Sequence, residues 1–176
     1  MKEITIKKEV YNLPESWEEI SLKQFNDIQL ISELETSATR KSIKTLAVLL
    51  GIDEKMVAKI PIKESSLIDL SFLQKEIPRK AVTQFTIDDI TYSPIKDFNT
   101  LSLGEYADID YYMNNDLFNN IHYIAAIVCR PINVLGEMEE YDSDTLEQRA
   151  LLLYNKMNIV QLMSVAGFFL CLEKDS

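Results

Sequence analysis

The sequence ISLKQFNDI at residues 20–28 recurs in altered form as LSLGEYADI at residues 101–109, and this pair organises the chain. The spacing of 81 residues also holds upstream, so that residues 5–28 align with residues 86–109. Seven of the 24 aligned pairs are identical, and several others are conservative. We interpret the alignment as an internal duplication, which predicts two structurally similar halves.

Each stretch carries the signal for the start of a helix. Ser21 and Ser102 can cap the first free backbone N–H groups of the helices that follow them. Gln24 and Glu105, three residues further on, can accept a hydrogen bond from the backbone N–H of these serines. The sequence therefore predicts a capping box in each half.

A short β-hairpin is predicted ahead of each cap, because residues 3–11 and 84–92 alternate between apolar and polar side chains. The polar turns of these hairpins are Lys7-Lys8 and Asp88-Asp89. Apolar periodicity and capping signals predict helices at residues 22–33, 37–50, 53–60, 63–75, 103–113, 117–129, 142–155 and 160–172. The predicted fold class is α+β and mostly helical. Its two pseudo-repeats span residues 1–80 and 81–176, each a short hairpin followed by a capped helix and further packed helices.

Residues 132–142 have no counterpart in the first half and are predicted to form an acidic surface loop. The loop contains four large apolar or aromatic residues, Val134, Leu135, Met138 and Tyr141. Such side chains are costly to leave in water and can anchor a partner protein inside a polar rim. We hypothesise that they form a protein interface together with the C-terminal helix at residues 160–172. The alternative is a loop that folds back on its own domain.

The composition restricts the classes of function. The chain of 176 residues has 47% hydrophobic residues, enough for a buried core, and a net charge of −10. A strongly acidic chain is unsuited to neutralising phosphates, so nucleic acid and anionic membrane surfaces are not expected partners. The longest apolar run, residues 157–172, is shorter than the roughly 20 residues of a membrane span. Cys129 and Cys171 are expected to be buried free thiols.

No catalytic, cofactor-binding or metal-binding constellation is predicted. His122 is the only histidine, and no convergent partner can be identified for it, which favours a structural or interface role. The acidic residues between 137 and 144 lack the spacing and glycine of a calcium loop. Three further aspartates could be imagined as catalytic carboxylates, Asp108, Asp110 and Asp116. Asp108 matches Asp27 of the other repeat, which favours a role in helix architecture. The aromatic residues of the repeats, Trp17, Phe25, Phe98 and Tyr106, are expected in hinges or in the core.

An ordered series of short motifs resembles small tail-region proteins encoded in genomes of tailed bacteriophages. The motifs are residues 13–20 (LPESWEEI), 22–25 (LKQF), 101–108 (LSLGEYAD), 125–131 (AAIVCRP) and Tyr141. The resemblance implies a non-enzymatic virion structural or assembly protein of the portal, neck or tail region. Its partners would be other phage structural proteins or a further copy of itself, and it would reside in the host cytoplasm during assembly or in the virion.

Two alternatives stay open at this point. A transient tail assembly chaperone would hold a tail component soluble and would be absent from the mature virion. An acidic regulator would instead mask a basic partner outside any phage, which the net charge of the chain would suit.

Overall fold

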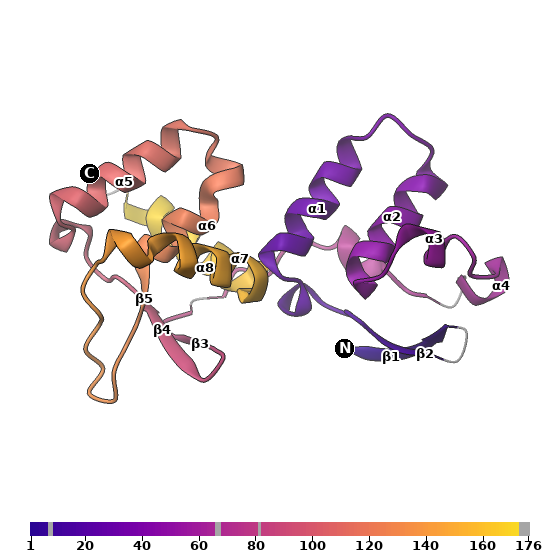
Figure 1. Ribbon diagram of the computed structural model, residues 1–176, viewed down its shortest axis with the longest axis horizontal. Coiled ribbons are helices and arrows are strands. Elements are labelled where there is room, and N and C mark those ends of the chain that lie inside the picture. The colour runs from indigo at the N-terminus through magenta and orange to yellow at the C-terminus, as the bar shows by residue number, and fades with distance from the viewer. Residues whose placement is uncertain (7–8, 66–67, 81, 173–176) are drawn as a thin grey trace. The chain divides into compact units, whose positions relative to one another are not determined.

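The computed structural model describes residues 1–6, 9–65, 68–80 and 82–172. The chain forms two compact units, Met1–Pro78 and Arg79–Ser176. In Figure 1 the first unit runs from indigo to magenta, and the second continues through orange to yellow. The fold is α+β and mostly helical, with 55% helix and two small antiparallel sheets that are each followed by helices. This confirms the predicted fold class.

The first unit opens with a two-stranded sheet and continues with helices. Its elements are β1 (Lys2–Ile6), β2 (Glu9–Leu13), the 3-10 helix η1 (Trp17–Glu19), α1 (Leu22–Glu33), α2 (Ala38–Leu50), α3 (Glu54–Val57), α4 (Ile62–Ser65) and the 3-10 helix η2 (Ser71–Gln74). The predicted Lys7-Lys8 turn lies outside the described residues. The ring of Trp17 packs edge-on against Phe25 at 6.0 Å and against Phe72 at 5.7 Å, so η2 closes over the start of α1.

The second unit repeats this order and adds a third strand. Its elements are β3 (Phe85–Ile87), β4 (Ile90–Pro94), the 3-10 helix η3 (Phe98–Thr100), α5 (Leu103–Asn114), α6 (Leu117–Val128), β5 (Cys129–Pro131), the 3-10 helix η4 (Ser143–Thr145), α7 (Leu146–Lys156) and α8 (Ile159–Leu172). The strand order is β3-β4-β5. The C-terminal half of α6 forms the centre of the core, where Ala126 and Ile127 have no solvent exposure.

The elements of the two units follow the spacing of 81 residues found in the sequence. Strands β2 and β4, 3-10 helices η1 and η3, and helices α1 and α5 each begin and end 81 residues apart. The hairpin register agrees as well, since Ile4 pairs with Tyr11 and Phe85 pairs with Tyr92. The repeat is therefore visible at the level of residue pairing and not only in the order of the elements.

Both predicted capping boxes are present. The Ser21 Oγ accepts from the Gln24 backbone N–H at 3.2 Å, and the Gln24 Oε1 accepts from the Ser21 N–H at 3.0 Å. The Ser102 Oγ accepts from the Glu105 N–H at 3.2 Å, and the Glu105 Oε2 accepts from the Ser102 N–H at 2.7 Å. These four residues satisfy helix-terminal donors, as the sequence predicts.

The side chains of Gln24 and Glu105 also tie their helices to the segment where the next helix ends. In the first unit the Gln24 Nε2 donates to the carbonyl oxygens of Val48 and Leu49, at 3.3 and 3.5 Å. In the second unit Glu105 forms an ion pair with Arg130, which stands 81 residues after Leu49. Equivalent positions of the two repeats are thus joined by an amide that donates to backbone carbonyls in the first unit and by a carboxylate that pairs with a guanidinium in the second.

Strand β5 differs from the prediction of a helix that continues to residue 129. Helix α6 ends at Val128, and the next three residues pair with β4, Ser93 opposite Arg130. The cause is local, because Pro131 disfavours helical backbone in the residue before it. The chain therefore turns into a strand here, where the first repeat completes its second helix.

The helix predicted at residues 63–75 is wrong. Helix α4 ends at Ser65, and the next helical element described is the short 3-10 helix η2. The Asp69 Oδ1 accepts from the Ser71 N–H at 2.9 Å, a local bond that favours a turn over a continued helix. The Trp17 Nε1 then donates to the Lys75 carbonyl oxygen at 3.0 Å and holds the segment against the first unit's core.

Candidate interaction site

The inserted segment of the second unit forms a hairpin-like arm, which we define as residues 132–141. The Ile132 N–H donates to the Thr91 carbonyl at 2.9 Å, which extends the pairing between β4 and β5. Ile132 also forms an isolated antiparallel bridge with Met138, and the Glu139 N–H donates to the Pro131 carbonyl at 2.9 Å. Figure 1 shows the arm in orange, running down beside the β3–β4 hairpin.

Asn133 organises the turn at the tip of the arm. Its Oδ1 accepts from the N–H groups of Leu135 and Glu137 at 2.9 and 3.0 Å, and its Nδ2 donates to the Glu137 Oε2 at 2.8 Å. The Gly136 N–H donates to the Asn133 carbonyl, and Gly136 has a φ of +80°, the left-handed conformation that favours glycine. This is the pattern of a three-residue hairpin loop. The tip is thus a defined turn, whereas the sequence analysis predicted only a loop.

The turn holds two apolar side chains in solvent. Val134 is 102% exposed and Leu135 is 78% exposed, relative to their reference areas. Beside them, an open groove of about 820 Å³ separates the tip from the β3–β4 hairpin, whose exposed Ile90 lines it. Asp89 also lines the groove, so the apolar surface has an acidic border. An exposed apolar group with a polar rim has the chemistry of a protein-binding surface.

The base of the arm is anchored and differs from the prediction. Met138 and Tyr141 are half-buried, and the Tyr141 hydroxyl donates to a carboxylate oxygen of Asp108 on α5. Burial, together with this bond, raises the pKa of Tyr141. The Glu139 carboxylate lies 3.4 Å from the Arg149 guanidinium on α7. Of the four side chains predicted for the interface, the structure therefore presents Val134 and Leu135 to solvent and uses the other two within the unit.

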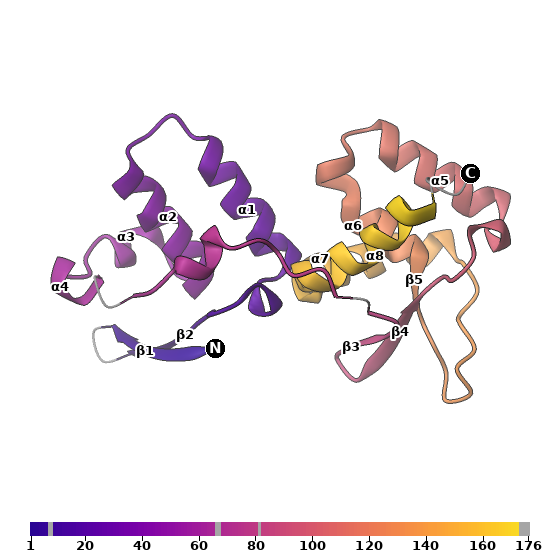
Figure 2. The same cartoon turned by 180° about the vertical axis from the view of Figure 1, so that it is seen from behind.

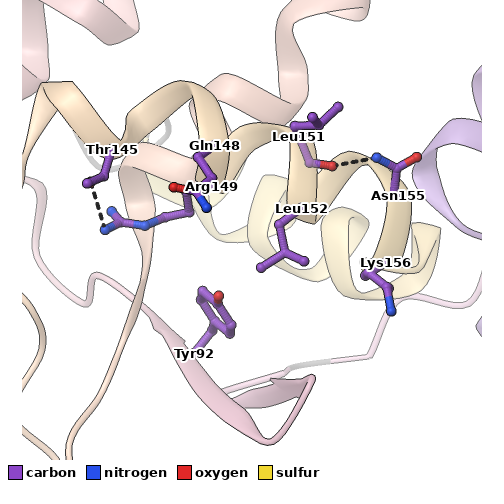
Figure 3. A pocket seen from close by; sticks show the side chains of 8 residues that line it. All are labelled: Tyr92, Thr145, Gln148, Arg149, Leu151, Leu152, Asn155 and Lys156. Atoms are coloured by element: carbon purple, nitrogen blue, oxygen red, sulfur yellow. Dashed lines mark hydrogen bonds between the residues drawn. The ribbon is translucent and has the colours of Figure 1, made fainter.

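A second cavity lies between β4 and α7 and has a volume of about 460 Å³ (Figure 3). Its lining residues are Tyr92, Thr145, Gln148, Arg149, Leu151, Leu152, Asn155 and Lys156. The Lys156 Nζ lies 3.0 Å from Asp88, and the guanidinium of Arg149 is paired as described above, so both cations of the lining are engaged. The lining has no histidine, cysteine or carboxylate, and its titratable side chains are Tyr92, Arg149 and Lys156.

The residues considered for catalysis have separate structural positions. His122 lies against the rings of Tyr123 and Tyr154, with centroids 4.5 and 4.8 Å away, and burial lowers its pKa. Asp116 caps α6 by accepting from the Asn119 N–H at 3.3 Å. Within the described part of the chain, no group of three or more histidine, cysteine or acidic residues could hold a metal ion.

The remaining observations concern the cysteines and membranes. Cys129 is a free and fully buried thiol, and burial raises its pKa, which makes it a poor nucleophile. The side chain of Cys171 lies outside those described. Among the helices that the structure describes, none combines the length and hydropathy needed to cross a membrane.

Comparisons with protein-family models, with curated proteins and with solved structures found no match to this chain.

Proposed function

We propose that the protein is a non-enzymatic structural or assembly protein of a tailed-bacteriophage virion, in the portal, neck or tail region, and that it acts through protein–protein contacts. The observation that carries the proposal is the tip of the arm. There, hydrogen bonds of Asn133 fix a turn whose two apolar side chains, Val134 and Leu135, stand in solvent. The phage assignment comes from the ordered sequence motifs, and the mechanism comes from the arm.

The arm has the features of an anchor that inserts into a partner. Large apolar side chains contribute most to binding when they enter a pocket and lose their water. The turn is already ordered by its own hydrogen bonds, so binding would cost little conformational entropy at this point. The partner surface that fits is an apolar pocket with a basic or neutral edge, since Asp89 lies in the groove beside the tip.

The test is a double substitution at the tip, Val134→Asp with Leu135→Asp, in the phage genome that encodes the chain. Because both side chains are exposed, the stability of the isolated protein should change by no more than about 0.5 kcal/mol per site. The yield of complete particles should fall by about tenfold or more, as expected when interface anchors are removed. Val10→Asp, at an exposed position of β2, is the matched control and should leave the yield unchanged.

Mass spectrometry of purified particles then separates the two phage roles. A virion component stays in the particle in stoichiometric amounts, whereas a tail assembly chaperone is present in infected cells and missing from particles. A normal yield of particles from the double variant would contradict the proposed mechanism in either role.

A further inference from the structure

Helix α5 presents an apolar stripe to solvent, at the end of the second unit opposite the tip of the arm in both views (Figures 1 and 2). Leu103 is 84% exposed, Tyr106 is 61% exposed, and Met113 is also exposed. Together with Asp110 they are spaced by three, four and three residues, so they lie along one face of the helix. This corrects the expectation that Tyr106 lies in a hinge or in the core, since it stands exposed within helix α5.

The internal repeat shows that this exposure is specific to the second unit. Leu22, the equivalent of Leu103, is 1% exposed on α1. Phe25, the equivalent of Tyr106, is half-buried and packs on Trp17. At these two positions the first turns of the helix are thus covered in one repeat and open in the other, although the residues are apolar or aromatic in both. Further along the helix the equivalents of Asp110 and Met113 are the polar residues Gln29 and Ser32, so the apolar residue at position 113 is particular to the second unit.

The stripe is separate from the residues that hold α5 in its own unit. Glu105 and Ile109 are the buried residues of this helix, and Glu105 makes the ion pair to Arg130 described above. The helix therefore has its own inward face. Leucine, tyrosine and methionine on the outer face add nothing to that packing, and a contiguous exposed patch of this kind is typical of an interaction site.

The charge of the second unit decides between possible occupants. Residues 79–176 contain seven lysine and arginine residues against fifteen acidic ones, a net charge of −8 out of the chain's −10. Asp110 stands exposed in the middle of the stripe. In a pair of α5 helices, the two Asp110 carboxylates would lie close together near the centre and the two acidic units would repel. A second copy of this chain is therefore a poor occupant.

We propose that the stripe of Leu103, Tyr106, Asp110 and Met113 is a docking surface for a basic amphipathic helix of a partner protein. Apolar side chains of that helix pack on the stripe, in the mode of helix-in-groove recognition. A lysine or arginine of the partner pairs with Asp110 and sets the register. This surface is independent of the arm and does not rest on the phage assignment.

The experiment uses the full chain and two designed helical probes. One is a fluorescent peptide of leucine and lysine with leucines in the same three–four spacing, and the other has glutamate in place of lysine. Fluorescence anisotropy should show binding of the leucine–lysine peptide and at least about tenfold weaker binding of the leucine–glutamate peptide. The double variant Tyr106→Ser with Met113→Ser should weaken binding of the leucine–lysine peptide by about tenfold.

Two charge-reversing substitutions distinguish binding at a specific site from general attraction to an acidic protein. Asp110→Lys should reverse the preference between the peptides. Glu140→Lys changes the net charge equally at an exposed residue of the arm, and should alter binding by no more than about twofold, since distant exposed charges are screened by salt. Circular dichroism checks that each variant is folded. Equal effects of Asp110→Lys and Glu140→Lys, or a dimer of the wild-type chain that Tyr106→Ser disrupts, would overturn the proposal.

Discussion

The ion pair between Glu105 and Arg130 offers a test of how the second unit is held together. Its side chains are 5% and 12% exposed, and one contact of 3.1 Å joins the Glu105 Oε1 to the Arg130 Nη2. Glu105→Gln keeps an oxygen that can accept from the Ser102 N–H, as Gln24 does for Ser21 in the first unit. The substitution therefore removes the charge and leaves the helix cap in place.

The expected effect follows from the burial of Arg130. Removing one partner of a buried ion pair costs about 3–5 kcal/mol, because the other charge stays buried without compensation. The single contact places this pair at the lower end, so we expect a loss of about 3 kcal/mol in the free energy of unfolding of the second unit. For a unit of about 100 residues that corresponds to a fall in Tm of roughly 12–24 °C.

Two controls make the result specific. Glu54→Gln removes the carboxylate from the pair with Lys44, whose side chains are about one-third exposed, and should cost no more than about 1 kcal/mol. Adding Arg130→Met to Glu105→Gln should recover part of the loss, since it removes the buried charge that the first substitution leaves uncompensated.

The assay is urea unfolding followed by two signals. The sole tryptophan, Trp17, lies in the first unit, so its fluorescence reports on that unit, while circular dichroism reports on both. Glu105→Gln should shift the circular dichroism transition to lower urea and leave the fluorescence transition in place. A variant within about 0.5 kcal/mol of wild type, the range of an ordinary surface substitution, would refute the reasoning.

Three further predictions concern caps, glycines and pH. Ser21→Ala and Ser102→Ala should each cost about 0.5–2 kcal/mol in urea melts, with the larger loss at Ser102 because Gly104 already weakens its helix. Gly104→Ala should stabilise the chain by about 0.5–1 kcal/mol, since the added Cβ meets only the Ser102 Oγ at 3.9 Å. Gly136→Ala should instead cost about 1–2 kcal/mol, because Gly136 has a positive φ. The same urea melts would measure both changes. Burial lowers the pKa of His122. The contribution of neutral His122 to the free energy of unfolding is therefore complete above the unfolded pKa of about 6.5 and is lost as pH falls through the folded pKa. A nuclear magnetic resonance titration that showed a raised His122 pKa would contradict this.

The signals that predicted the fold are local. A serine followed three residues later by Gln24 or Glu105 specifies a helix start through bonds within four residues, and both boxes formed. Gly51 has a φ of +65° at the end of α2, the left-handed conformation in which a glycine commonly ends a helix. These features depend little on the rest of the chain, so one sequence suffices to place them.

The features that the sequence analysis missed depend on contacts between distant segments or on short signals. Strand β5 has three residues, too few for a periodic pattern, and only Pro131 hinted at the change of backbone. The spacing of Asn133 and Gly136 could have identified the hairpin turn of the arm. Burial of Tyr141 follows from its bond to Asp108, 33 residues away in the chain, which no local pattern encodes.

Under the proposed function, the arm tip contacts another phage structural protein, and photocrosslinking at the tip would detect that contact. A photoreactive amino acid at Leu135 would be activated in infected cells during assembly, with exposed Lys59 of the first unit as the control position. We expect Leu135 to crosslink to one portal, neck or tail protein, identified by mass spectrometry, and we expect no crosslink from Lys59 to that protein. The absence of any phage structural protein among the Leu135 products, from cells that produce particles normally, would contradict this expectation.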